Sequence, residues 1–363
     1  MGDFTSSGYL GLLHSSSALV SWDRIALGKP AALADPPGAI ETAVMLAALQ
    51  GCQRATLATS TLHVFWDLFG QCPPEETAVF VDRGAYAIGQ WGVERAAARG
   101  IPVHSFVHFD PASLACQLAS HRTGRRPIVL ADGYCPDCGR PAPVGPYLRS
   151  IRRSNGLLIL DDTQAVGILG VRTADRSPYG SGGGGSLQWH DIASADAARV
   201  LIVASFAKAF SAPVAALSGA RQLIADFEDR SGTRVHCSPP SIPAIRSLNH
   251  ALSINHRAGD ALRSRLLARI ERFRNGLFGY GVPIGPGVFP VQSLPAPMGR
   301  QPHDFVQALH RRGVSAVVTQ GRETAERRVS FLFNARHSTA DVDHAVRMIV
   351  ALYANRGRAQ EAI

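Results

Sequence analysis

An aspartate and a lysine follow two separate apolar runs of the chain, where their charges could hold one cofactor between them. Asp161 comes directly after the apolar residues 157–160, and Lys208 follows the run 200–207. A carboxylate at the end of a buried strand is costly unless it meets a cation, and the protonated nitrogen of a pyridinium ring is such a cation. A lysine amine in the second position can form a Schiff base. The pair therefore indicates pyridoxal 5'-phosphate (PLP), with Lys208 as the lysine of the internal aldimine.

Two nearby segments could bind the phosphate of such a cofactor. Ser205 precedes Lys208 by three residues, so its hydroxyl could donate to a phosphate oxygen. A short polar turn precedes the apolar helix predicted at 63–69, and helix N-termini bind phosphate through their free N–H groups. The candidate residues of this turn are Ser60, Thr61 and Leu62.

Short apolar runs alternate with longer helical patterns over the first two thirds of the chain. The predicted strands are residues 78–82, 127–131, 157–161 and 200–204, and the predicted helices include 90–99, 113–121 and 144–154. Strands that are apolar on both faces belong to a sheet covered by helices on both sides. Strand–helix repetition predicts a mostly parallel sheet whose chemistry lies at the carboxyl ends of its strands.

The pattern changes after about residue 244. A long arginine-rich amphipathic helix at 246–277 leads to a Gly/Pro-rich corner at 281–288, and short strands and helices follow. The flexible glycine run at 181–186 is followed by a polar stretch, so we interpret it as part of a surface insertion. No strand-to-helix pattern frames it, which argues against a phosphate-binding role. The expected parts are an N-terminal segment at 1–40, a large PLP-binding domain at 41–245 and a smaller α+β domain at 246–363.

The composition is that of an ordinary globular protein, with 46% hydrophobic and 18% charged residues. No run reaches the roughly 18 uninterrupted apolar residues that span a bilayer. The first residues lack the basic start and apolar run of a secretion signal, which favours a cytoplasmic protein. The formal charge of +9 would suit an anionic substrate, and no nucleic-acid motif accompanies it. Cys135 and Cys138 form a lone C-x-x-C without a second pair, so we predict no metal site.

Five segments of the chain resemble the motifs of the α-oxoamine synthase family of fold-type I PLP enzymes. Residues 3–12 are similar to "NFSSNDYLGL" and 132–143 to "EGVFSMDGDxAP". Residues 161–170 resemble "DDAHGxGVLG", 205–210 resemble "TFGKGFG", and 328–338 resemble "RLRLTLTAAHT". The matches follow one another in order over nearly the whole chain. The resemblance implies an α/β fold of PLP-dependent transferase type I, with a mostly parallel central sheet and a smaller C-terminal α+β domain.

The resemblance also implies a role for each matching residue. Asp161 would bind the pyridine nitrogen, and Lys208 would carry the aldimine and shuttle protons. Ser205 and the turn at 60–62 would hold the phosphate. Arg328 matches the arginine that binds the amino-acid carboxylate, a task that suits a planar guanidinium.

Ser238 lies in a segment that, in the family, contributes to the cofactor pocket across a dimer interface, so a homodimer is expected.

Several positions of this chain differ from the family motifs. Tyr86 stands where a histidine stacks on the cofactor; its ring can stack but does not titrate near neutral pH. Gln164 replaces a second histidine and can hydrogen-bond but not titrate. Pro136 replaces a serine, and residues 28–37 lack the family's "GSGGSR".

Taken together, these residues predict a PLP-dependent C–C bond-forming acyltransferase. It would condense an amino acid with an acyl-CoA or acyl-carrier-protein thioester. Two alternatives stay open. One is another PLP reaction on the same scaffold, such as transamination, aldol-type chemistry or β/γ-substitution in specialised metabolism. The other is a non-catalytic partner subunit, against which the presence of Lys208 argues.

Overall fold

The chain packs as two units in a computed structural model, which describes residues 2–121, 124–174, 177–321 and 326–354. The larger unit holds residues 13–135 and 141–259, and the smaller unit holds 1–12, 136–140 and 260–363. The first twelve residues therefore pack with the C-terminal part of the chain. The division between the units falls inside the long helix α10 (Ile242–Phe278).

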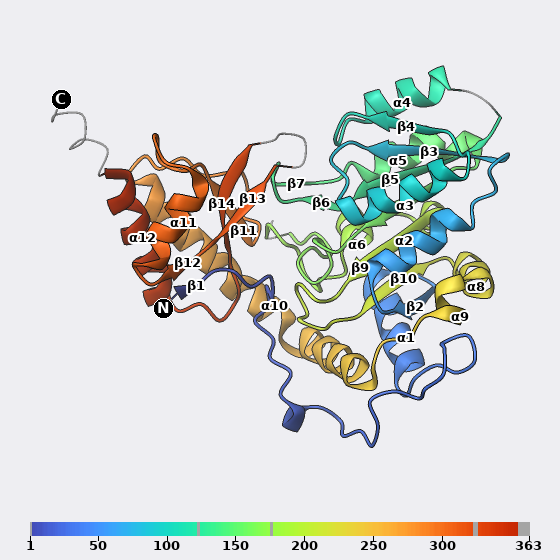
Figure 1. The fold of residues 1–363 in the computed structure, drawn as a ribbon, viewed down its shortest axis with the longest axis horizontal. Coiled ribbons are helices and arrows are strands. Elements are labelled where there is room, and N and C mark those ends of the chain that lie inside the picture. Colours follow the sequence, from blue (N-terminus) through green and yellow to red (C-terminus); the bar gives the residue numbers. More distant parts are fainter. Residues whose placement is uncertain (1, 122–123, 175–176, 322–325, 355–363) are drawn as a thin grey trace. The chain divides into compact units, whose positions relative to one another are not determined.

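A seven-stranded sheet forms the centre of the larger unit (Figure 1). Its strand order is β2-β10-β9-β8-β5-β3-β4. Only β10 runs antiparallel to its neighbours in this sheet, which confirms the predicted mostly parallel arrangement. The strands are β2 (Arg54–Ala58), β3 (Thr77–Asp82), β4 (Val103–Phe106), β5 (Arg126–Asp132), β8 (Leu157–Asp161), β9 (Val200–Ser205) and β10 (Ala215–Gly219).

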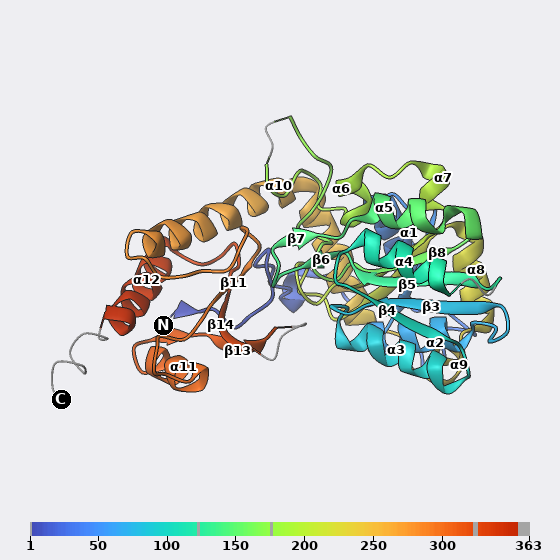
Figure 2. The ribbon, with the colours of Figure 1, turned by 90° about the horizontal axis from the view of Figure 1, so that it is seen from above.

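Helices cover both faces of this sheet. Figure 2 shows α2 (Thr61–Gly70) and α3 (Ala87–Ala98) on one side of the strands, and α4 (Pro111–Ser120) and α5 (Val144–Ile151) on the other. Central strand side chains such as Val129 and Leu158 are fully buried, and each such burial contributes about 1.5–3 kcal/mol. The other elements of this part of the chain are η1 (Ser16–Ala18), α1 (Ala39–Gln50), β6 (Tyr134–Cys135), β7 (Arg140–Pro141), η2 (Arg152–Ser154), α6 (Ser186–His190), α7 (Ser194–Ala197), α8 (Arg221–Arg230) and α9 (Gly232–His236).

Local sequence explains where the helices near the site begin. The Ser60 hydroxyl caps α2 by accepting the His63 N–H at 3.4 Å. The Asp110 carboxylate caps α4 by accepting the N–H groups of Ala112 and Ser113, and Pro111 occupies the first helical position. The predicted helix at 90–99 begins three residues earlier, at Ala87, because Tyr86 holds the extended backbone that precedes the first turn.

The glycine run at 181–186 is not the surface insertion that we predicted. Gly183, Gly184 and Gly185 are buried. The Gly185 N–H donates to the Leu169 carbonyl at 2.7 Å. A Cβ on Gly184 would overlap the carbonyl oxygen of Leu49, and one on Gly185 would overlap the Asp162 carboxylate. The glycines are there because packed backbone and a buried carboxylate leave no room for side chains.

The smaller unit contains a three-stranded antiparallel sheet in the order β11-β14-β13. Aromatic side chains form part of its core, where Phe4 packs against Phe331 and Phe333. This unit therefore has the α+β composition that we predicted for the C-terminal part. Its elements are β1 (Gly2–Asp3), residues 260–278 of α10, β11 (Val291–Leu294), α11 (Pro302–His310), β12 (Val314–Ser315), β13 (Val317–Gln320), β14 (Arg327–Leu332) and α12 (Thr339–Ala354).

Candidate active site

The carboxyl ends of the central strands bring the predicted cofactor residues together in the larger unit. Asp161 is the last residue of β8 and is 5% exposed. Lys208 lies three residues beyond Ser205, the last residue of the neighbouring strand β9. Because β8 and β9 are parallel and paired up to Asp161 and Val203, both ends open on the same edge of the sheet.

Asp161 and Lys208 perturb each other electrostatically. Burial raises the pKa of the Asp161 carboxyl, while hydrogen bonds from Thr163 and the charge of Lys208 oppose that rise. Burial likewise lowers the pKa of the Lys208 amine, and Asp161 opposes this shift. Each group therefore lacks the solvation that stabilises its charge in water. A lysine with a lowered pKa presents more of the neutral amine that can act as a nucleophile.

Tyr86 supplies an aromatic ring beside this pair. The Lys208 amine lies 5.7 Å from the centre of the Tyr86 ring, and Tyr86 is 47% exposed. The Tyr86 N–H donates to the buried carboxylate of Asp132 at 3.0 Å. Asp132 ends β5 and is paired in register with Asp161. The sequence analysis did not select Asp132, although it has the same pattern as Asp161, an aspartate closing an apolar strand.

Thr163 is a second residue that the sequence analysis missed. Its N–H donates to the Asp161 carboxylate at 3.0 Å, and its hydroxyl accepts the N–H of Ser205 at 3.0 Å. One residue therefore links the end of β8, through its backbone N–H, to the end of β9, through its hydroxyl. Sequence alone offers only a weak signal for it, a threonine two residues after a strand-end aspartate.

The two segments that carry the candidate phosphate ligands follow strand residues that lie side by side in the sheet. Ala58 of β2 and Ser205 of β9 are both paired with Ala215 of the strand between them. The turn that opens α2 follows Ala58 directly. Ala58 and Ser205 therefore lie about 10 Å apart, given the usual spacing of two strands, and α2 begins three residues after Ala58. The Ser60 hydroxyl already bonds the His63 ring at 2.7 Å, which leaves the backbone of Thr61 and Leu62 as the stronger anion donors.

The remaining predicted residues have different settings. Gln164 is half-buried on the turn after Asp161. Ser238 is exposed, and its carbonyl accepts the hydroxyl of Thr59 at 2.7 Å, so it lies beside the turn that opens α2. Arg328 belongs to the smaller unit, where it lies on β14 and pairs with Glu326 at 2.8 Å. That ion pair raises the pKa of the Arg328 guanidinium.

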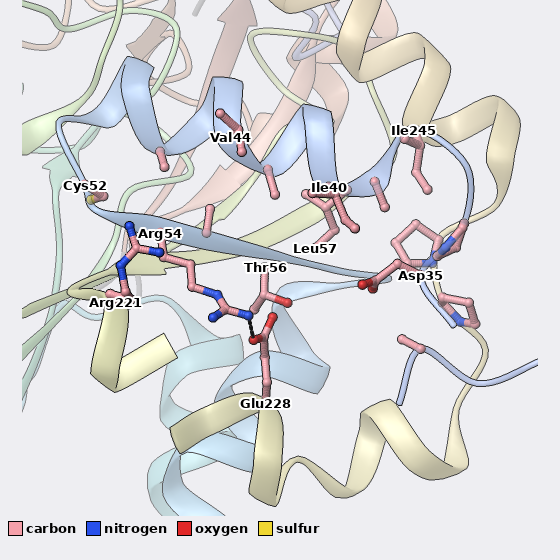
Figure 3. A pocket seen from close by; sticks show the side chains of 18 of the residues that line it. Asp35, Ile40, Val44, Cys52, Arg54, Thr56, Leu57, Arg221, Glu228 and Ile245 are labelled. Atoms are coloured by element: carbon pink, nitrogen blue, oxygen red, sulfur yellow. Dashed lines mark hydrogen bonds and ion pairs between the residues drawn. The ribbon is translucent and has the colours of Figure 1, made fainter. Parts of the chain in front are cut away.

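A separate cavity of about 510 Å³ lies between α1 and the edge strand β2 (Figure 3). Its wall combines apolar side chains of α1, among them Ile40 and Val44, with an ion pair between Arg54 and Glu228. Among the described residues that line it, none is a predicted cofactor ligand. The cavity is therefore distinct from the site at the strand ends.

The model of the class I and II aminotransferases matches residues 59–349, which include every candidate residue named above. The chain belongs to this family. It is 29% identical over 290 residues to 8-amino-7-oxononanoate synthase of Dechloromonas aromatica, covering 76% of this chain and 67% of that one. It is 25% identical over 352 residues to the enzyme of the same name from Sodalis glossinidius, covering 94% and 85%. Within the family the chain is an α-oxoamine synthase-type, PLP-dependent transferase, as its motifs predicted.

The fold is also that of PLP enzymes of known structure. A serine palmitoyltransferase solved with a PLP internal aldimine superposes with a TM-score of 0.83 at 14% identity, over 99% of this chain and 88% of that one. This similarity confirms the fold-type I prediction. No helix in the described part of the chain has the length and apolar content to cross a membrane.

The residues of the larger unit fit PLP by the chemistry of their donor groups. A buried carboxylate, a half-buried amine and an aromatic ring are arranged at neighbouring strand ends. These groups match a pyridinium nitrogen, an aldehyde and a ring face. The N-terminus of α2 adds donors for a phosphate. This edge of the sheet is therefore the candidate cofactor site.

Proposed function

We propose that the chain is a C–C bond-forming acyltransferase that condenses an amino acid with an acyl thioester. The observation that carries the proposal is the pair of the buried Asp161 and the half-buried Lys208 at adjacent strand ends, with Tyr86 beside Lys208. When bound, PLP supplies an electron sink for the substrate Cα. The roles below are assigned to this chain's own residues.

Asp161 would hold the ring nitrogen and keep it protonated, because a buried carboxylate is stabilised by an adjacent cation. Lys208 would bind the cofactor covalently and then move protons at the substrate Cα. Its lowered pKa increases the fraction of neutral amine that can accept a proton. Ser205, Ser238 and the residues 60–62 would hold the phosphate end. Tyr86 would cover one face of the ring, and Gln164 would donate a hydrogen bond without titrating.

The guanidinium of Arg328 and the net positive charge of the chain support two kinds of substrate. Arg328 would bind the amino-acid carboxylate through its planar guanidinium. The net charge of +9 favours an anionic acyl donor, either coenzyme A or an acidic carrier protein. The relatives' name, 8-amino-7-oxononanoate synthase, supports condensation chemistry for this chain without naming its substrates.

A second candidate is another PLP reaction on the same scaffold, such as transamination. Tyr86 and Gln164 favour it, because both stand where the family motif has histidine and neither can replace imidazole acid–base chemistry. A non-catalytic subunit is the third candidate, and the presence of Lys208 at the end of β9 argues against it.

Purified protein incubated with PLP tests the central assignment. We expect an absorption band at ~420 nm, as a lysine-bound cofactor gives, that is absent in Lys208→Ala. Incubation with each amino acid plus an acyl-CoA should then release free thiol. Accumulation of pyridoxamine phosphate without thiol would support transamination instead. A protein that never binds PLP would refute both enzymatic proposals.

We also infer a cytoplasmic homodimer. Two apolar side chains of α1 support it, because Ile40 is 67% and Val44 is 64% exposed, and both border the cavity of Figure 3. Light scattering should report a dimer for the wild type and a monomer for Ile40→Asp/Val44→Asp. The control variant Phe278→Asp changes an apolar side chain outside α1 that is 85% exposed, and it should stay dimeric. A monomeric wild type would contradict the inference.

A further inference from the structure

A pair of histidines lies beside the turn that carries Lys208, with His14 in contact with the turn and His250 in contact with His14. The His14 ring bonds the Phe210 carbonyl through Nε2 at 2.8 Å, and Phe210 is two residues beyond Lys208. On the other side, Nδ1 of His14 lies 3.3 Å from Nδ1 of His250, with the two rings nearly perpendicular. All three residues belong to the larger unit.

The bonding partners fix the protons of this pair. A carbonyl oxygen only accepts, so the hydrogen must be on Nε2 of His14. In a neutral ring, Nδ1 of His14 is then an acceptor, and His250 must donate from its own Nδ1. The result is one directed chain of hydrogen bonds, from His250 to His14 to the Phe210 carbonyl. His250 thereby selects the His14 tautomer that can hold that carbonyl.

The turn itself has an unfavourable conformation at Ser211. Ser211 has a φ of +53°, a left-handed backbone angle that glycine adopts readily and other residues adopt rarely. The α-oxoamine synthase motif "TFGKGFG" has glycine at this position. Such an angle persists only where the surroundings hold it. Inside the turn, the N–H of Ser211 donates to the Lys208 carbonyl at 3.1 Å, and that of Ala212 donates to the Phe206 carbonyl at 3.0 Å.

We propose that His14 is a positioning residue that holds the Lys208 turn through the Phe210 carbonyl, with His250 fixing its tautomer. The bond to Phe210 joins residues 196 positions apart and directly precedes the strained Ser211. Glycine would adopt the left-handed angle without help, whereas Ser211 is held in it by the hydrogen bond between His14 and the neighbouring Phe210 carbonyl. The structural part of this inference does not depend on the function proposed above; only the expected effect of His14 on catalysis rests on the proposed role of Lys208.

Hydrogen exchange in cofactor-free protein tests the contact directly. Peptides covering residues 205–214 would be followed by mass spectrometry. We expect His14→Phe to raise exchange of the Ser211 and Ala212 amides about 10-fold, since a turn that opens more often exchanges faster. His14→Gln should stay within about 2-fold of the wild type, because its side-chain amide can still donate at the position of Nε2. Unchanged exchange in His14→Phe would overturn the proposal.

A second set of variants separates positioning from general loss of structure. Ser211→Gly added to His14→Phe should restore slow exchange, because glycine adopts the left-handed angle without the contact. His250→Asn keeps a donor at the place of Nδ1 and should resemble the wild type, whereas His250→Phe should resemble His14→Phe. Failure of Ser211→Gly to rescue the turn would count against the mechanism even if His14→Phe is unstable.

The cofactor-loaded enzyme gives the functional readout. His14→Phe should lower kcat by on the order of 10-fold with little change in KM, because a displaced lysine affects the chemical step. It should also change the pH midpoint of the ~420 nm band. A cofactor band that persists in Lys208→Ala would refute the proposed function but not the exchange result. If Lys208→Ala loses the band but His14→Phe keeps both the spectrum and the hydrogen-exchange rates of the wild type, only this inference is refuted.

Discussion

Replacing Thr163 with valine should weaken both the fold at the strand ends and the affinity for PLP. Valine keeps the shape of threonine and removes only the hydroxyl. The backbone N–H that donates to Asp161 at 3.0 Å remains, but the acceptor for the Ser205 N–H is lost. An amide left without a partner costs about 1–3 kcal/mol of folding stability.

The effect on cofactor affinity follows from Asp161. The Thr163 side chain lowers the pKa of Asp161 against the rise that burial causes. Without it, Asp161 is a weaker partner for a ring cation. A hydrogen bond to a charged group contributes about 1.5–3 kcal/mol, and about 1.4 kcal/mol corresponds to 10-fold in affinity. We therefore expect the Kd for PLP to increase by on the order of 10-fold.

Equilibrium unfolding in urea and PLP titration followed by absorbance would measure the two effects. Thr163→Ser is the matched control, since it keeps the hydroxyl and should bind PLP nearly as the wild type does. If Thr163→Val and Thr163→Ser showed the same stability and the same Kd, the strand-end link would have no energetic role.

Three further predictions concern other parts of the chain. Burial lowers the pKa of His190 from 6.5 to about 4. As the pH falls, the unfolded state therefore takes up this proton before the folded state does, and the free energy of unfolding decreases between pH ~6.5 and ~4 by at most about 3 kcal/mol. His190→Gln should flatten this part of a curve of unfolding free energy against pH. Arg328→Lys should raise KM for the amino acid about 10-fold with a smaller change in kcat, because lysine cannot bind a carboxylate in bidentate fashion; an unchanged KM would remove Arg328 from the substrate site. Gly185→Ala should destabilise the fold by more than about 2 kcal/mol in urea unfolding, because its Cβ would overlap the Asp162 carboxylate. Gly182→Ala, with a similar φ of +82° and open space around it, should cost only about 1 kcal/mol, and equal losses in the two variants would contradict the packing argument.

Periodicity predicted the central strands closely. Residues 157–161 form β8 as expected, and the other three predicted strands differ by one residue at one or both ends. The glycine run at 181–186 misled the sequence analysis, because glycine is equally frequent in flexible linkers and at close packing contacts. Only the neighbours of Gly184 and Gly185 distinguish the two, and those neighbours come from distant segments.

The sequence by itself determined the sheet, the family and the pair of ionisable residues, Asp161 and Lys208, because each depends on short patterns along the chain. The tertiary structure decided which groups hold that pair in place. Thr163 reaches Ser205 across 42 residues, Tyr86 reaches Asp132 across 46, and His14 reaches Phe210 across 196. Such hydrogen bonds depend on strand order and on loop angles such as that of Ser211, and neither leaves a periodic pattern in the sequence.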